Sequence, residues 1–242
     1  MSQHDGYFGE EVAASYDAAA ADMFDHSVVD PAVGLLAELA AGGRALEFGI
    51  GTGRIALPLA RRGVEVHGID VSRAMVDRLR EKPGGFAIGV TIGDFADTRV
   101  PGEFSLAYLV FNTICNLTTQ AAQIACFVNA AKHLRPGGRF VIEVGVPALR
   151  LLPPGQRAVP FAVDDGHLAY DIYDCATQTM SSNYVDERGR RSIPFRYVWP
   201  SELDLMARMA GMVVAHRWQD WDRAPFTHES TRHVSVWTKS DA

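Results

Sequence analysis

Between Arg44 and Val146 the sequence alternates short apolar runs with longer amphipathic segments, and this rhythm restricts the fold more than any other feature. Parallel strands that are covered on both faces read as nearly continuous apolar runs, whereas the helices between them keep a polar face. The pattern therefore predicts an α/β protein built on a doubly wound, mostly parallel sheet. The expected strands are residues 44–48, 64–69, 86–92, 104–111 and 139–146.

Helices are expected at residues 55–63, 73–81 and 119–134, between these strands. Two more precede the first strand. One is Ala-rich and runs from Glu10 to Asp22, and the other begins with Asp30 as its N-cap and Pro31 at its first helical position. Arg135-Pro136-Gly137-Gly138 predicts a helix stop and a turn before the fifth strand.

The rhythm breaks at Pro147, and residues 160–198 read as antiparallel strands with hairpin turns at Asp165-Gly166 and at 187–190. A helix from Pro200 and strands at 212–218 and 232–238 follow. We therefore divide the chain into an N-terminal part with the ligand-binding core, an antiparallel β insertion that serves as a lid or a dimer surface, and the rest of the core sheet. These parts are 1–146, 147–199 and 200–242.

Charge and composition limit the partners. The chain has 242 residues, with 23 Lys and Arg against 29 Asp and Glu, which gives a net charge of −6. Phosphate neutralisation needs a surplus of basic residues, so a nucleic acid is not expected as the main partner. No apolar run reaches membrane-spanning length, the start of the chain lacks the regions of a signal peptide, and the three cysteines show no metal spacing. We expect a cytoplasmic protein without a metal site, and a homodimer is one assembly the chain allows.

The strongest motif is Leu46-Glu47-Phe48-Gly49-Ile50-Gly51-Thr52-Gly53-Arg54, where the first strand passes into a helix. Glycines there permit a tight turn and close approach of a ligand to the backbone. Dinucleotide-binding proteins carry GxGxxG at this place. Here the third glycine of that pattern is replaced by Arg54, which weakens the interpretation as a NAD-dependent dehydrogenase but does not remove it.

Together with two later acidic residues, these residues resemble the class I S-adenosylmethionine-dependent methyltransferases. The family signature after the first strand is matched by Glu47, Gly49, Gly51 and Gly53. The resemblance continues with an acid at the end of each of the next two strands and with the end of the fourth strand. These positions are Asp70 with Val71, Asp94 with Phe95, and Phe111 with Asn112.

The resemblance implies S-adenosyl-L-methionine as cofactor and a Rossmann-like, seven-stranded sheet with N-terminal helices. It further implies that Asp70 accepts the ribose hydroxyls, that Asp94 accepts the adenine amine, and that Phe95 holds the adenine ring. Tyr16, on the N-terminal helix, and Arg54 are expected to contact the cofactor's carboxylate. Within the family the chain looks most similar to small-molecule enzymes, including those that methylate amino sugars.

Methyl transfer to an amine, phenol or alcohol requires a group that takes the proton of the acceptor. Glu143, in the apolar strand VIEVG, and His228, in a loop near the end of the chain, are the candidate catalytic bases. A hydrogen-bonded strand-end carboxylate and a solvated loop histidine are the competing interpretations. We predict methyl transfer to a nitrogen or oxygen of a small-molecule acceptor. A macromolecule-directed (tRNA or protein) methyltransferase and a non-catalytic cofactor-binding protein remain as alternatives.

Overall fold

The computed structural model describes residues 7–164, 166–187 and 189–240. Residues 1–6, on which part of the leader-peptide expectation depends, lie outside this part of the chain, as do Asp165 and Arg188 in two of the expected hairpin turns. Within the described ranges, no helix is long and apolar enough to cross a bilayer.

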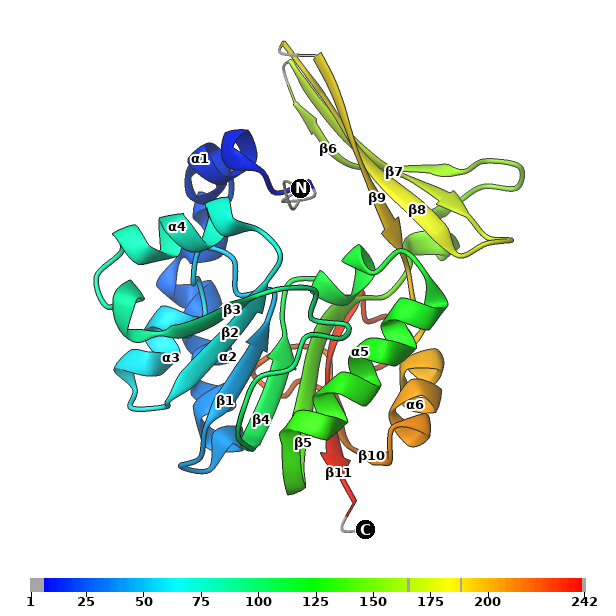
Figure 1. Cartoon of the computed structure of the whole chain (residues 1–242). Helices are drawn as coiled ribbons and strands as arrows, with labels where there is room; N and C mark the ends of the chain where they lie inside the picture. The colour runs from blue at the N-terminus through cyan, green and yellow to red at the C-terminus, as the bar shows by residue number, and fades with distance from the viewer. Residues whose placement is uncertain (1–6, 165, 188, 241–242) are drawn as a thin grey trace.

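A seven-stranded sheet forms the centre of the molecule, in the order β10-β11-β5-β4-β1-β2-β3 (Figure 1). Strands β1 to β5 are parallel, and β11 is antiparallel to both of its neighbours. The predicted doubly wound, mostly parallel sheet is confirmed. Its strands are β1 Ala45–Phe48, β2 Val66–Asp70, β3 Gly89–Ile92, β4 Phe104–Leu109, β5 Leu134–Gly145, β10 Met212–Trp218 and β11 Arg232–Lys239.

Helices cover both faces of this sheet. One buried cluster joins the sheet to α5 and α6, and the other joins it to α2, α3 and α4. In β4, Ala107 and Leu109 belong to the first cluster and Leu106 and Tyr108 to the second, as the twofold alternation of a strand requires. The helices are α1 Glu10–Ala19, α2 His26–Ala40, α3 Ala56–Arg61, α4 Arg73–Glu81, α5 Gln120–His133 and α6 Pro200–Met209, with short 3-10 turns η1 Ala21–Phe24, η2 Gly85–Ala87, η3 Thr113–Asn116 and η4 Ala148–Leu151.

The start of α2 differs from the prediction. The helix begins at His26 rather than after Asp30, because Asp25 is the N-cap and accepts a 2.7 Å hydrogen bond from the Ser27 N–H. Pro31 therefore lies inside the helix. A proline there removes one intrahelical hydrogen bond, and the early cap compensates for part of that loss.

The predicted turn at Arg135–Gly138 lies inside β5 rather than before it. Phe104 of β4 pairs with Leu134, whereas Leu106 pairs with Arg139, so four residues bulge out of the ladder between these pairs. Gly137 accordingly has φ +70°. The turn-forming residues bend the strand, and pairing resumes beyond them.

The antiparallel insertion forms a separate four-stranded sheet, in the order β6-β7-β8-β9. Its strands are β6 Ala158–Asp164, β7 His167–Asp174, β8 Thr179–Asp186 and β9 Gly189–Arg196. The buried guanidinium of Arg196 anchors the sheet, because it pairs with Glu202 of α6 at 2.7 Å and donates to Gln123 of α5. Figure 1 shows this sheet standing above the edge at which the parallel strands end, across from α1.

Candidate functional site

Asp70, the last residue of β2, fixes the glycine turn that follows β1. Its carboxylate accepts hydrogen bonds from the Gly51 N–H at 2.7 Å and the Ser72 N–H at 2.9 Å, and the residue is 8% exposed. Gly49 and Gly51 have φ of +72° and +53°, in the left-handed region that favours glycine. The strand-end carboxylate and the glycine turn therefore form one unit.

Gly53 is required for a packing reason as well. Its φ is +82°, and a Cβ atom built there would lie 2.3 Å from Cδ1 of Leu79 on α4. Arg54 turns away from this contact. Its guanidinium donates to the Met23 carbonyl at 3.2 Å and lies 5.3 Å from the centroid of the Phe111 ring. The arginine thus bridges the start of α3 to the end of β4 without crowding the turn.

Glu47 lies beneath the turn and is 2% exposed. It accepts a 2.9 Å hydrogen bond from the Tyr108 hydroxyl, across the β1–β4 pair. Burial raises the pKa of Glu47 to about 8, although the Tyr108 hydrogen bond and the positive charge of Arg54 act in the opposite direction. This acidic residue of the motif supports the turn from inside the core.

Helix α1 covers the glycine turn from the outside. The Thr52 hydroxyl donates to Asp17 of α1 at 2.6 Å, and Lys82 forms an ion pair with the same carboxylate while donating to the Thr52 carbonyl at 2.8 Å. The Ser72 hydroxyl donates to the Phe8 carbonyl at 2.5 Å. These bonds fix the N-terminal segment to the glycine turn and to the start of α4.

Tyr16 projects from α1 toward the same edge. It packs with Phe8, Ala13, Ala74 and Met75. Burial raises the pKa of its hydroxyl, the charge of Arg54 lowers it, and nearby acidic groups, Asp70 among them, raise it further. The structure thus brings Tyr16, Arg54 and Asp70 together, although their sequence positions are far apart.

The acid after the third strand lies at the same edge. Asp94 is exposed, and its carboxylate accepts a 2.8 Å hydrogen bond from the Ala96 N–H. The Phe95 ring is 8% exposed and stacks on Phe48 at 5.8 Å, so it belongs to the core beneath the edge. Val71 is 38% exposed.

The ends of β4 and β5 are joined by side chains. The Glu143 carboxylate accepts a 3.0 Å hydrogen bond from the Phe111 N–H, and Asn112 Oδ1 accepts a 2.7 Å hydrogen bond from the Gly145 N–H. Phe111 and Asn112 both have positive φ, +56° and +60°. Strain of this kind is typical of functional sites. Glu143 lies directly beside Phe111, whose ring is 42% exposed.

His228 lies in the loop between β10 and β11, where its side chain is 91% exposed and its Nε2 atom is 3.9 Å from Glu229. The preceding aromatic residues of this region, Trp218 and Trp221, pack against the core cluster that contains α2. The loop therefore places His228 in solvent and does not bring it into contact with Glu143 among the described residues.

Sequence reasoning missed the part played by Asp17 and Thr52. Their hydrogen bond joins positions 35 residues apart, and no motif in the sequence predicts it. Asp17 stands in a plain Ala-rich helix, one residue after Tyr16. The sequence offered Tyr16 as a sign that this helix contacts the cofactor, but it offered nothing that marked Asp17.

The residues at this edge fit the cofactor that the resemblance implies. Asp70 offers carboxylate oxygens suited to paired hydroxyl groups, and its two backbone donors fix its orientation. A Cβ atom built at Gly51 would lie 3.5 Å from Met75 Cε, which is an ordinary contact. The positive φ of Gly51, rather than crowding by neighbouring atoms, therefore favours glycine there. The order of the strands also reverses between β1 and β4, where ligands of open α/β sheets bind.

The chain is similar to known methyltransferases. The family model described as a methyltransferase domain matches residues 45–138. The structure of the CcbJ methyltransferase from Streptomyces caelestis is similar to this chain, with 35% identity, a TM-score of 0.84, and coverage of 98% of this chain and 99% of that one.

Two further relatives span nearly the whole chain. The cypemycin N-terminal methyltransferase of a Streptomyces species is 28% identical, over 91% of this chain and 96% of the relative. The S-adenosylmethionine-bound structure of CalS10, an amino pentose methyltransferase from Micromonospora echinaspora, shares the fold at 19% identity and a TM-score of 0.66, with coverage of 93% and 96%. The chain therefore belongs to the class I S-adenosylmethionine-dependent methyltransferases, and S-adenosylmethionine is its cofactor.

Proposed function

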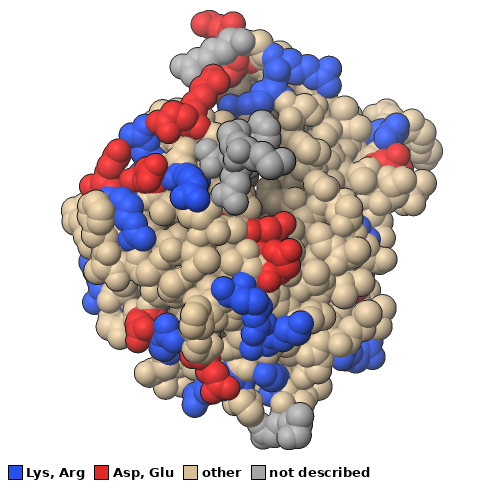
Figure 2. Space-filling view, viewed as in Figure 1, with Lys and Arg blue, Asp and Glu red and all other residues tan. Residues whose placement is uncertain are grey.

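We propose that this enzyme transfers the methyl group of S-adenosylmethionine to an amine nitrogen of a small molecule. The observation that carries the proposal is the position of the insertion sheet above the carboxyl edge of the parallel strands (Figure 1). Figure 2 shows the surface hollowed beneath this sheet. An acceptor that reaches the edge must enter beside the insertion, and this favours small compounds over a nucleic acid duplex.

Charge and relatives support the same acceptor class. On the face shown in Figure 2, basic and acidic residues are interspersed, and the chain has a net charge of −6. A nucleic acid enzyme is expected to carry a basic stripe. The cypemycin relative is named for methylation at an N-terminus, which is an amine. A hydroxyl acceptor is the alternative that the test below distinguishes.

The residues proposed to bind the cofactor lie on the glycine turn, at the strand ends and on α1. We assign Asp70 to the ribose hydroxyls, Asp94 to the adenine amine, and Arg54 and Tyr16 to the carboxylate. When bound, the cofactor supplies a methyl group on a sulfonium, already activated for in-line displacement. The full proposed set is Tyr16, Glu47, Gly49, Gly51, Gly53, Arg54, Asp70, Val71, Asp94, Phe95, Phe111 and Asn112.

Much of the rate acceleration of such a reaction comes from aligning the acceptor atom with the methyl group. The rest comes from removing the proton of the acceptor. Glu143 is a proposed base because its carboxylate lies at the end of β5, hydrogen-bonded to the backbone of Phe111. His228 is the second proposed base, because it is a histidine in the exposed loop between β10 and β11.

The proposal is tested by two measurements on the full chain. Isothermal titration should show S-adenosylmethionine binding, and a screen of matched amine and alcohol libraries by mass spectrometry should show +CH2 products of amines. Products of alcohols alone would move the assignment to oxygen. Cofactor binding without product from either library would contradict the proposed activity.

A further inference from the structure

One face of the insertion sheet looks onto the carboxyl edge of the core. Side chains alternate along β7, so Ala169, Asp171 and Tyr173 share a face. Ala169 is fully buried and Tyr173 is 4% exposed, whereas Leu168 on the opposite face is 38% exposed. The face that holds Asp171 is therefore the covered one.

Two contacts show what covers this face. Tyr173 packs with Val159 and Tyr197 and against the η4 segment that follows β5. Strand β9 of the same sheet contacts η3, which follows β4 directly. Burial raises the pKa of Cys115 in η3 to about 12, Arg196 lowers it, and the charge of Asp171 raises it. This face of the sheet therefore looks toward the segments that follow β4 and β5.

Asp171 is hydrogen-bonded but is not paired with a cation in the part of the chain that the structure describes. Its carboxylate accepts a 2.6 Å hydrogen bond from the Ser182 hydroxyl and a long one, 3.5 Å, from the Tyr173 hydroxyl. Within the described residues it forms no ion pair, and burial raises its pKa. A partly buried carboxylate without a positive partner is costly unless a ligand supplies the charge.

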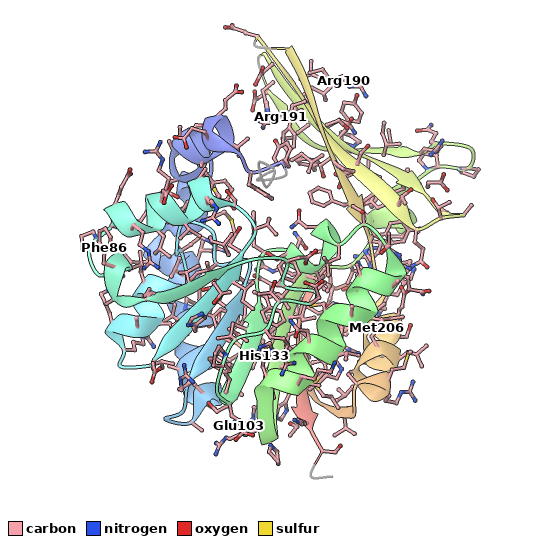
Figure 3. The ribbon with its side chains drawn as sticks, in the orientation of Figure 1. Phe86, Glu103, His133, Arg190, Arg191 and Met206 are labelled. Atoms are coloured by element: carbon pink, nitrogen blue, oxygen red, sulfur yellow. The ribbon has the colours of Figure 1, made fainter. Side chains whose placement is uncertain are left out.

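Aromatic rings extend the same face toward α1. Tyr184, which pairs with Ala169 in the register, lies 5.8 Å from the Phe161 ring. Arg191 lies over the Tyr184 ring at 4.9 Å and forms no ion pair with Asp171 within the described residues. In Figure 3 Arg191 lies on the side of the sheet that faces α1, and Arg190 lies on the other side. Aromatic faces beside a carboxylate favour organic cations.

We propose that Asp171 binds the methyl acceptor: its carboxylate, flanked by Tyr173 and Tyr184, holds a basic amine that is cationic at neutral pH, above the ends of β4 and β5. This inference rests on the proposed function and adds the residue that selects the acceptor's charge. Asp171 acts in binding. The ammonium loses its proton to one of the two proposed bases, Glu143 or His228, before the nitrogen lone pair reacts.

The test uses two probes that share a benzyl group. Benzyltrimethylammonium is a cation whose nitrogen has no proton to lose and no lone pair, so it cannot be methylated. Benzyl alcohol is neutral. Binding to the full chain is measured by saturation-transfer NMR titration in the presence of S-adenosylhomocysteine. We expect the wild type to bind the cation more tightly than the alcohol. D171N should weaken binding of the cation by about tenfold or more and leave that of the alcohol unchanged, as loss of a charged partner predicts.

E187Q is the matched control, because Glu187 is an exposed acid in the turn that follows β8 of the same sheet. It should leave both affinities unchanged. Equal affinity of D171N and wild type for the cation would overturn the inference, and so would wild-type binding of the alcohol as tight as that of the cation. The wild-type comparison needs no variant, so it stands even if D171N folds poorly.

The failure of this inference differs from the failure of the proposed function. Amine products in the library screen, together with D171N binding the cation normally, would refute the role of Asp171 alone. Cation binding that depends on Asp171, without any methylated amine, would refute the proposed activity alone.

Discussion

Tyr108 donates its hydroxyl to Glu47 at 2.9 Å, from β4 to β1, and both residues are buried. The pair lies directly under the glycine turn, on the face of the sheet that α2 and α3 cover. A buried carboxyl group in such a place is stabilised by its hydrogen bonds and by its proton. The pair therefore links the stability of the turn to a single hydrogen bond and to pH.

Y108F removes that hydrogen bond and keeps the ring. The Glu47 carboxyl would remain buried without this donor, so we expect the free energy of unfolding to fall by about 1–3 kcal/mol. Urea denaturation measures the change. Y170F is the control, because Tyr170 is partly buried and its hydroxyl makes no hydrogen bond with the described residues. An equal loss in both variants would contradict the role of the pair.

E47Q should flatten the dependence of stability on pH. The pKa of Glu47 is about 8 in the folded chain and near 4.5 when unfolded. The folded state holds the proton more tightly, so this contribution is fully present below pH 4.5 and is lost as pH rises through about 8. Comparing wild type and E47Q by urea denaturation from pH 5 to 9 should show their difference change over this window. Parallel curves would rule out the raised pKa.

D17A should loosen α1 from the glycine turn. The variant loses the hydrogen bond from Thr52 and the ion pair with Lys82. We expect faster backbone hydrogen exchange in α1 and weaker binding of S-adenosylmethionine, by about tenfold. D22A, in the exposed start of η1, is the matched control. Unchanged exchange in D17A would show that other contacts hold the helix.

The D70N substitution should lower the affinity for S-adenosylmethionine more than the substitution of an exposed acid does. Replacing the carboxylate weakens its acceptance from two backbone N–H groups and from the proposed ribose hydroxyls. We expect a loss of about ten- to a hundredfold by isothermal titration. D77N, on the exposed side of α4, should bind normally. Equal affinity of the two variants would remove Asp70 from the site.

E143Q tests the base nearest the strand ends. If Glu143 takes the acceptor proton, kcat should fall at least about tenfold. E103Q is the control, because Glu103 lies at the opposite edge of the sheet (Figure 3). H228A is measured in parallel. A fall in kcat in H228A with an unchanged kcat in E143Q would assign the base to His228.

Much of the fold follows from local rules. Ser72 accepts from the Met75 N–H and Thr119 from the Ala122 N–H, and both helices begin where sequence rules place them. The predicted start of α2 was wrong because Asp25 and Asp30 are both good N-caps. The longer helix that begins after Asp25 packs on the sheet. The turn at Arg135–Gly138 was misplaced because pairing with β4 continues on both sides of it.

The sequence by itself determined which residues stand at the strand ends. Parallel strands finish at one edge, so an acid that follows a strand must lie there, and Asp70, Asp94 and the glycines could be located by position alone. Only the tertiary structure decided what lies above and below that edge. The protonation of Glu47, the contact of Asp17 with Thr52 and the bond between Asp171 and Ser182 depend on burial and on contacts between different segments, and no local pattern encodes these.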